Sequence, residues 1–404
     1  MYKPVARPLT PVEFHRLAGS FTASEEAADR RDFGTGGFIF LALYNISSGL
    51  LRDLQDSLQG QGVEIFFPVD GELKTETMPN VLLAGRNDFF QRLGERLASR
   101  EDRDWTPLSR VLAGITGPAV EKRWLLGGGK SLVMGGRPRI MGILNLTPDS
   151  FYDGSAYRDV NSAIDHAARM VEEGADLIDV GGESTRPGAS PVSADLEKER
   201  VVPVIREIAR RFPEQIISVD TYKSEVARAA LGEGAAAVND ISAGTLDKRM
   251  LETVAGLKAG YVMMHMRGEP RTMQLNTAYD DMVGEIYLFF ARCLEKTQES
   301  GISWESIALD PGIGFGKSPE ANYELIYRLA EFAPLGRPIL AGCSRKSFMA
   351  LAGLKDPAER LEGTLAACTV AVISGADILR VHDIGPVQRA VSVASLFPKP
   401  SRFQ

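Results

Sequence analysis

Three short apolar runs in this sequence each end in a side chain that accepts hydrogen bonds. Asp220 follows 216–219, Asn239 follows 236–238 and Asp310 follows 307–309. Two carboxylates and an amide, whose nitrogen also donates, suit a flat heterocycle that carries several N–H donors and ring acceptors. Any one of these residues could instead be a helix cap or a turn residue. The recurrence of the pattern along the chain is what favours a binding site.

A second set of candidate residues is cationic. Arg186, Lys346 and Arg380 carry positive charge, and His382 stands two residues after Arg380. Arginine and lysine bind phosphate through charge-assisted hydrogen bonds, so this set indicates a phosphorylated ligand. The sequence contains no evident Ser-His-Asp or Cys-His arrangement, and therefore no activated nucleophile is predicted. Its four histidines lack the spacing of a zinc site.

Glycine-rich segments surround these residues. Asp310 is followed by Pro-Gly-Ile-Gly-Phe-Gly-Lys over 311–317. Glycines let a backbone turn tightly and approach a ligand closely. Two other loops, 145–154 and 181–190, are rich in glycine, proline and polar residues. We interpret these two as mobile lids that exclude water from a reaction.

Eight apolar runs separated by helical stretches must position the candidate residues. We expect strands at 140–144, 177–180, 216–219, 236–238, 261–264, 307–309, 339–341 and 378–380. Strands that alternate with helices predict a parallel sheet, and eight such units over about 260 residues match a (β/α)8 TIM barrel. A doubly wound open sheet is the alternative. In a barrel, the ends of these runs would meet at one face: Asn145, Asp179 with Glu183, Asp220, Asn239 with Asp240, His265, Asp310, 344–346, and Arg380 with His382.

The first part of the chain predicts a separate small α/β domain. Strands are expected at 38–45, 63–69 and 81–84, and helices at 48–59, 88–99 and 107–113. Residues 114–118 read as a linker, so we place this domain at 1–118 and the barrel, which opens with a hairpin over 123–134, at 119–404. The first domain has no phosphate loop and no catalytic cluster. We expect it to contribute no chemistry, and its role is not predicted.

Composition excludes several classes of protein. Among 404 residues, 44% are apolar and 25% charged, with a net charge of -7, which argues against a general binder of nucleic acid or anionic membranes. The three cysteines form no CxxC pair, and buried free thiols are expected. The start of the chain has no signal-peptide core, and no apolar stretch approaches the length of a membrane span. A cytoplasmic enzyme is expected.

Residues 123–398 resemble the dihydropteroate synthase family. The resemblance is carried jointly by 145–154, 181–190, 218–221, 239–241, 264–266, 310–317, 344–346 and 380–383. It implies a homodimeric TIM-barrel enzyme of folate biosynthesis. Such an enzyme joins 4-aminobenzoate to 6-hydroxymethyl-7,8-dihydropterin diphosphate and releases pyrophosphate with the help of Mg²⁺. The family is the target of sulfonamide drugs.

The resemblance also implies a role for each matching residue, and the catalytic set would be Asp220, Asp310, Lys346 and Arg186. The pterin would be held by Asp220, Asn239, Met264, Asp310 and Lys346. The diphosphate would be held by Asn145, Arg186, Arg380 and His382, with Asn145 also reaching Mg²⁺. The aminobenzoate would be bordered by Thr185, Pro187, Phe315, Ser344 and Lys346.

Two features depart from the family pattern. Tyr152 stands in the first loop where the family usually has a serine, and the domain at 1–118 is absent from the shorter members. Two other functions are weighed against the synthase. A methyltransferase module that binds a methylated folate would share the acidic grip on the pterin, but has no need of Arg186, Lys346 and Arg380. A non-catalytic paralogue would not need to retain every polar strand end.

Overall fold

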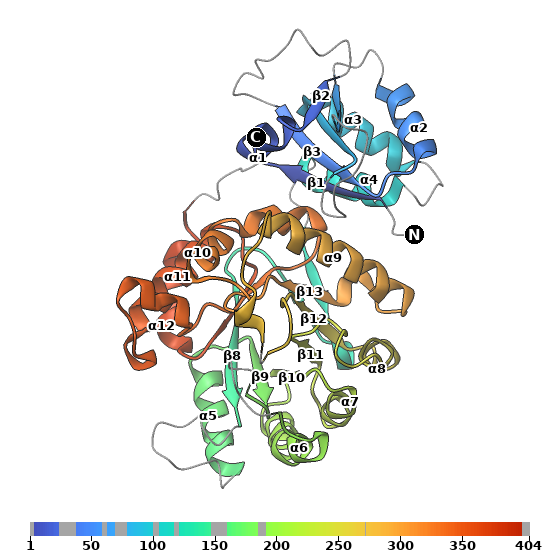
Figure 1. Ribbon diagram of the computed structural model, residues 1–404. Coiled ribbons are helices and arrows are strands. Elements are labelled where there is room, and N and C mark those ends of the chain that lie inside the picture. The colour runs from blue at the N-terminus through green and yellow to red at the C-terminus, as the bar shows by residue number, and fades with distance from the viewer. Residues whose placement is uncertain are drawn as a thin grey trace.

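The computed structural model describes residues 4–23, 38–58, 63–68, 79–99, 105–116, 121–146, 160–184, 191–270 and 272–397. A barrel of strands wrapped by helices forms the larger part of the molecule, and a smaller sheet with its own helices stands beside it (Figure 1). No helix in these ranges is long and apolar enough to cross a membrane.

Eight parallel strands form the barrel, in the order β13-β12-β11-β10-β9-β8-β15-β14. A bridge between Leu309 and Ile339 brings the two ends of the sheet together. The predicted (β/α)8 TIM barrel is therefore confirmed. The strands are β8 (Arg139–Asn145), β9 (Leu177–Gly181), β10 (Ile216–Asp220), β11 (Ala237–Asp240), β12 (Gly260–Met264), β13 (Ile307–Asp310), β14 (Leu340–Ala341) and β15 (Ile378–Val381).

Helices cover the outside of the barrel, and their starts are marked by capping residues. Ser193 and Ser318 each accept a hydrogen bond from the first turn of the helix that follows, and Pro319 occupies the first turn of the second of these. The helices are α5 (Val160–Glu172), α6 (Ala194–Arg211), α7 (Ser224–Gly232), α8 (Met250–Leu257), α9 (Met282–Glu299), α10 (Pro319–Tyr327), α11 (Leu361–Ile373) and α12 (Ile384–Ala394).

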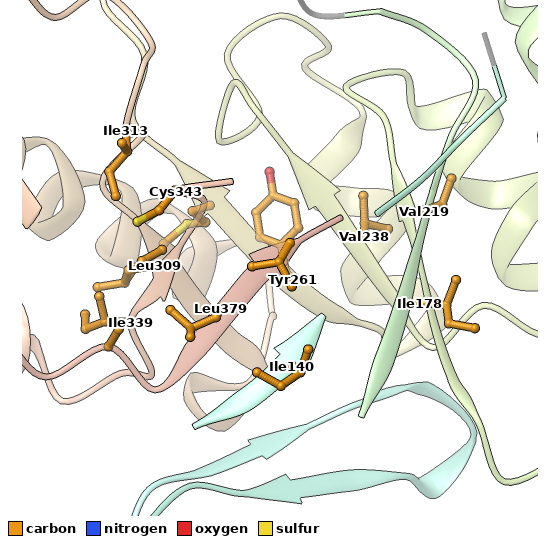
Figure 2. Close-up of a cluster of buried hydrophobic side chains, with 14 of the residues drawn as sticks. Ile140, Ile178, Val219, Val238, Tyr261, Leu309, Ile313, Ile339, Cys343 and Leu379 are labelled. Atoms are coloured by element: carbon orange, nitrogen blue, oxygen red, sulfur yellow. The ribbon is translucent and has the colours of Figure 1, made fainter. Parts of the chain in front are cut away.

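Alternate residues of the strands point outward and form the main core between strands and helices (Figure 2). Ile140, Ile178, Val219 and Leu379 are among them, and each is 0% exposed. Burying one such side chain contributes about 1.5–3 kcal/mol, so this layer is a large source of stability. Because side chains alternate along a strand, the residues next to these face the barrel interior.

A hairpin closes the amino-terminal end of the barrel. Its strands β6 (Arg123–Leu125) and β7 (Ser131–Val133) are joined by a 3-10 turn at Gly127–Gly129. Trp124 is fully buried and donates from Nε1 to the carbonyl of Ser306 over 2.9 Å. It packs with inward-facing residues of the strands, among them Met141, Val262 and Ile378. This floor leaves the carboxyl ends of the strands as the face for polar side chains.

The first part of the chain forms a five-stranded antiparallel sheet in the order β1-β3-β5-β4-β2. Helix α4 continues to Thr116, so the start of the segment expected to be a linker is helical, and the predicted boundary near 118 stays a prediction. The elements are β1 (Val5–Leu9), α1 (Pro11–Ala18), β2 (Phe21–Ala23), β3 (Phe38–Tyr44), α2 (Ser48–Leu58), β4 (Glu64–Pro68), β5 (Val81–Arg86), α3 (Asn87–Ala98) and α4 (Thr106–Thr116).

Candidate active site

Polar side chains replace apolar ones at the carboxyl end of the barrel interior. Register places Asp220 beside Asn239, and Met264 beside Asp310, in adjacent strands. Asn239, Asp310 and Met264 are 4%, 5% and 3% exposed. Their outward neighbours Val238, Leu309 and Met263 belong to the main core. The period of two thus turns every one of these candidate residues toward the interior.

Asp179 and Arg380 join several of these groups into one hydrogen-bonded network. Asp179 accepts from Ser218 Oγ over 2.5 Å and from Asn239 Nδ2 over 2.9 Å. Arg380 donates from Nε to Asp179 and from Nη2 to Asp220, each over 2.6 Å. Sequence reasoning gave Asp179 no role, although its place at an inward position of β9 was a usable signal. Arg380, expected at the diphosphate, lies between two carboxylates.

The network perturbs the acidity of Asp220. Burial raises the pKa of Asp220 to about 7, Arg380 opposes that rise, and the negative charge of Asp179 adds to it. Asp179 has three donors, whereas the contact of Asp220 in this network is Arg380 alone. Asp220 therefore exchanges a proton near neutral pH.

The glycine-rich loop after β13 is held against the segment after β12. Gly312 donates its N–H to Asp310 Oδ1 over 2.8 Å, which fixes that carboxylate. A β-carbon on Gly312 would lie 1.9 Å from the carbonyl oxygen of His265, and one on Gly316 would lie 2.9 Å from that of Arg267. Both glycines have positive φ, 72° and 62°. Only glycine allows this close approach of the two backbones.

Lys317 ties the same two segments together from within. Its Nζ is 3.1 Å from His265 Nδ1, 3.0 Å from the Gly312 carbonyl and 2.9 Å from the Phe315 carbonyl. Burial lowers the pKa of Lys317 to about 7, although Asp310 opposes that change, and burial also lowers the pKa of His265 well below its usual range. His265 is hence a neutral hydrogen-bonding residue. Sequence reasoning missed the role of Lys317, which the end of the glycine motif could have suggested.

Lys346 and Phe315 stand together at one side of the interior. Lys346 Nζ lies 4.3 Å from the centre of the Phe315 ring. Burial lowers the pKa of Lys346 to about 8, and the charge of Arg380 acts in the same direction. Phe315 and Met264 share an apolar cluster with Ile241 and Met273. This wall can contact the face of an aromatic ring, and Lys346 can donate to its polar edge.

Ser344 and His382 form a hydrogen-bonded pair at the ends of the last two strands. The Ser344 hydroxyl accepts from the His382 backbone N–H over 3.2 Å and lies 3.0 Å from its Nδ1. Burial, with Arg380 nearby, lowers the pKa of His382 to about 3, so this imidazole is neutral at pH 7. A neutral ring that accepts at Nδ1 carries its proton on Nε2. His382 can therefore donate to an anion but does not bring positive charge.

Asn145 ends β8 beside Asp220. A β-carbon on Gly181, in the neighbouring strand, would lie 3.4 Å from Asn145 Oδ1 and 3.6 Å from Asp220 Oδ2. No cluster of three His, Cys, Asp or Glu suited to a metal occurs among the described residues. Mg²⁺ commonly takes one or two protein oxygens and completes its shell with phosphates and water. The amide oxygen of Asn145 fits that limited role.

Three of the candidate site residues, and one residue that departs from the family pattern, are not described by the structure. Thr185, Arg186 and Pro187, together with Tyr152, lie outside the described residues. Two acidic strand ends have structural roles instead. Asp240 points outward and accepts from Ser242, Gly244 and the Tyr261 hydroxyl, and Glu183 pairs with Lys223.

The family model and the relatives described below match the barrel part of the chain. The family described as pterin binding enzyme matches residues 141–382. Dihydropteroate synthase of Synechocystis is 46% identical over 261 residues, which cover 64% of this chain and 90% of that protein.

Solved structures give the same result. Dihydropteroate synthase of Xanthomonas albilineans with 4-aminobenzoic acid has a TM-score of 0.64 and 41% identity, covering 69% of this chain and 100% of that one. The enzyme of Coxiella burnetii in complex with pteroic acid has a TM-score of 0.61 and 37% identity, covering 68% and 98%. With its barrel matched over nearly the full length of these relatives, the chain belongs to the pterin-binding enzyme family, among the dihydropteroate synthases.

Proposed function

We propose that this dihydropteroate synthase, a transferase of folate biosynthesis, condenses 6-hydroxymethyl-7,8-dihydropterin diphosphate with 4-aminobenzoate to give 7,8-dihydropteroate and pyrophosphate. The observation that carries the proposal is the meeting at one interior face of Asp220, Asn239 and Asp310, from three strands, with Lys346 from the segment after β14. Relatives crystallised with 4-aminobenzoic acid and with pteroic acid support both halves of the product.

In this proposal the pterin lies deepest in the barrel. Asp220 and Asn239 accept from its N–H donors, and Asp310, whose Oδ1 is held by Gly312, offers its second oxygen. Lys346 donates to a ring acceptor, and Met264 contacts the ring face. The two carboxylates also stabilise the positive charge that develops on the ring as the leaving group departs. Arg380 keeps Asp220 in place through its hydrogen bond.

The diphosphate lies toward Asn145, Arg380 and His382, and Arg186 is proposed as a further cationic ligand. His382 donates from Nε2, and Arg186 and Arg380 supply the positive charge that the leaving oxygens require. Asn145 would give an amide oxygen to Mg²⁺, which when bound neutralises charge on the departing diphosphate.

The reaction needs no covalent nucleophile from the protein. The bond between the exocyclic methylene and the diphosphate oxygen breaks, a bond from the arylamine nitrogen to that carbon forms, and the nitrogen loses one proton. An arylamine is already neutral near pH 7, so no strong base is required. Phe315, Ser344 and Lys346, with Thr185 and Pro187, would border the arylamine and keep its nitrogen in line.

Turnover is the direct test. Purified protein, the pterin diphosphate, 4-aminobenzoate and Mg²⁺ are mixed, and pyrophosphate release is measured; Asp310→Asn is the matched inactive control. Release that requires all the components is expected. Release independent of 4-aminobenzoate would reject the condensation in favour of simple hydrolysis. We further propose a homodimer, which light scattering after size-exclusion chromatography tests through the mass of the particle.

Binding should be ordered. In this proposal Arg186 lies in the same sequence segment as Thr185 and Pro187, and Asn145 ends β8 shortly before the segment that carries Phe151. Diphosphate that engages both residues would offset the cost of fixing these segments around the arylamine, about 1–2 kcal/mol per residue. Titration of 4-aminobenzoate with and without pyrophosphate and Mg²⁺ tests this. We expect tight binding only with pyrophosphate present, and an additional loss in Arg186→Ala. Equal affinity in both conditions would contradict the ordered scheme.

A further inference from the structure

Arg7, in strand β1 of the small sheet, is buried against the barrel. Its side chain is 0% exposed. Nη1 donates to Asp281 of the barrel over 2.6 Å, and Nη2 donates to Glu13 of α1 over 2.5 Å. Arg328 of the barrel reaches the same Glu13 and also pairs with Glu331 over 2.7 Å. The small sheet and the barrel thus share one buried ionic cluster.

An apolar contact holds the two parts together independently of this cluster. Leu288 of α9 is 3% exposed and packs with Phe14, Phe40 and Phe66 of the small sheet and its helix α1. A change confined to the ionic cluster therefore leaves a buried hydrophobic contact to keep the small sheet in place.

Asp281 is the barrel residue through which this contact reaches the active site. It caps α9 by accepting from Gly284 N over 3.1 Å, and it ends the segment 272–281 that follows β12. From that segment, the Tyr279 hydroxyl donates to the Gly316 carbonyl over 2.9 Å, and Gln274 Nε2 donates to the Gly314 carbonyl over 3.0 Å. These two bonds flank Phe315.

Gly284 shows how closely Arg7 is fitted to this place. A β-carbon at that position would lie 2.2 Å from Asp281 Oδ2 and 2.5 Å from Arg7 Nη1. Alanine would otherwise favour the helix in which Gly284 stands. The missing side chain makes room for the ion pair between the two parts of the molecule.

We infer that the small N-terminal sheet positions the arylamine side of the active site. Arg7 fixes Asp281, Asp281 fixes the segment 272–281, and Tyr279 and Gln274 fix the loop that carries Phe315. Arg7 is a positioning residue and touches no substrate. The inference gives a role to the part of the chain that has no candidate chemistry, and it rests on the proposed function where it assigns Phe315 to the arylamine.

Two variants of the full-length protein disturb the ion pair between Arg7 and Asp281 without removing Arg7. Gly284→Ala crowds the pair, and Asp281→Asn keeps an oxygen to cap α9 but loses the charge. The matched control is Arg110→Ala, because Arg110 also joins the two parts, stacking 4.4 Å from the centre of Trp304, without contacting 272–281.

Amide hydrogen exchange measured by mass spectrometry tests whether this ion pair stabilises the segments beside the active site. The measurement does not require the protein to turn over substrate. We expect exchange in 272–281 and 314–316 to rise about tenfold in Gly284→Ala and Asp281→Asn, with β3 unchanged, and to stay at the wild-type rate in Arg110→Ala. Exchange unchanged in both variants, or raised equally in the control, would overturn the inference.

Steady-state kinetics then test the assignment to the arylamine. In both variants the KM for 4-aminobenzoate should rise by at least about fivefold, while the KM for the pterin diphosphate stays near the wild-type value. Tyr279→Phe should cause a similar rise, and combining it with Gly284→Ala should add little, because both act through one segment. A full additive effect, or an equal rise in both KM values, would contradict this route. Absence of wild-type turnover would reject the proposed function and leave the exchange result standing.

Discussion

Asp179 accepts three hydrogen bonds inside the barrel, from Ser218, Asn239 and Arg380. It fixes the amide of Asn239 by accepting from Nδ2, which leaves the Asn239 oxygen and the second N–H to meet a ligand. Through Arg380 it also sets the place of Asp220. A residue that touches no proposed substrate thus determines which atoms of its two neighbours are presented.

The first prediction concerns Asn239. Asn239→Ala should weaken binding of the pterin by about 1–3 kcal/mol, because a buried donor on the ring loses its acceptor. Isothermal titration calorimetry measures this loss. Asp240→Asn is the neighbouring control: Asp240 points outward to Tyr261, so this variant should lose stability and keep its pterin affinity. Comparable affinity in wild type and Asn239→Ala would remove Asn239 from the pterin site.

The second prediction is a pH dependence from Asp220. Its pKa is about 7 in the folded protein, against 3.8 in an ordinary aspartate. Between these values the folded protein holds a proton that the unfolded chain has released, so Asp220 favours folding toward low pH and opposes it above pH 7.

Binding has the opposite dependence, because the pterin needs the ionised acceptor. Affinity for the pterin should fall about tenfold for each pH unit below 7. Titrations from pH 5.5 to 8 check this, with Asp220→Asn as a variant that should show weak binding without the same slope. A slope that survives in Asp220→Asn would assign the proton to another group.

Sequence reasoning identified these residues but not their partners. The period of two in each strand predicts that Asp220, Asn239, Asp310 and Arg380 face inward, and the structure has them on that face. It does not say which side chains meet across the barrel, because that depends on strand order and tilt. The link from Arg380 to Asp179, between residues 201 positions apart, is of this kind.

At the scale of elements, the loop 311–317 shows what local sequence can and cannot specify. Its glycines predicted a tight turn near a ligand, and Gly312 and Gly316 do allow two backbones to meet. The cause of the turn lies outside the loop, in His265 and Arg267 after β12. Strand ends were also predicted closely, whereas α4 was expected to stop at 113 and continues to Thr116, where Gly114 fits against Pro334.

The third prediction uses Lys317, which holds this loop. Its pKa is about 7 in the folded protein and 10.5 in an ordinary lysine. Between these values the unfolded chain binds a proton that the folded protein has released, so this lysine makes stability rise with pH. The difference in unfolding free energy between wild type and Lys317→Met should therefore change by about 1.4 kcal/mol per pH unit from 7.5 to 9.5.

Urea unfolding at several pH values measures that difference. Lys198→Met, which alters an exposed pair with Asp195, is the control and should show no such slope. Parallel pH curves for wild type and Lys317→Met would mean that Lys317 keeps an ordinary pKa in the folded protein.

For the molecule as a whole, the floor of the barrel joins the strands that the site requires. Trp124 of the hairpin reaches Ser306 and packs under residues from several strands. The fourth prediction is that Trp124→Ala lowers the unfolding free energy by about 3–5 kcal/mol, because it empties a large buried volume.

Denaturant unfolding checks the loss of stability, and Leu396→Ala, at a residue 85% exposed, should change it little. At temperatures where the variant is still folded, its KM values should match those of the wild type, since the floor lies at the far end from the polar face. A large change in KM with unaltered stability would mean that Trp124 acts on the site directly.

The hairpin floor also determines how substrates and products enter and leave the barrel. Because the hairpin closes the amino-terminal end, both substrates and both products pass through the opening at the carboxyl ends of the strands. They must therefore enter and leave one after another. If the pterin lies deepest in the barrel, as proposed, it must enter first, and the pterin half of the product leaves last. In that arrangement dihydropteroate leaves the barrel with its benzoate end first. In the proposed arrangement, bulk added to the benzoate end would extend into solvent, whereas bulk added to the inner edge of the pterin would meet the closed interior of the barrel. In this arrangement an inhibitor can be enlarged at the end that corresponds to the benzoate, but not at the inner edge of the pterin.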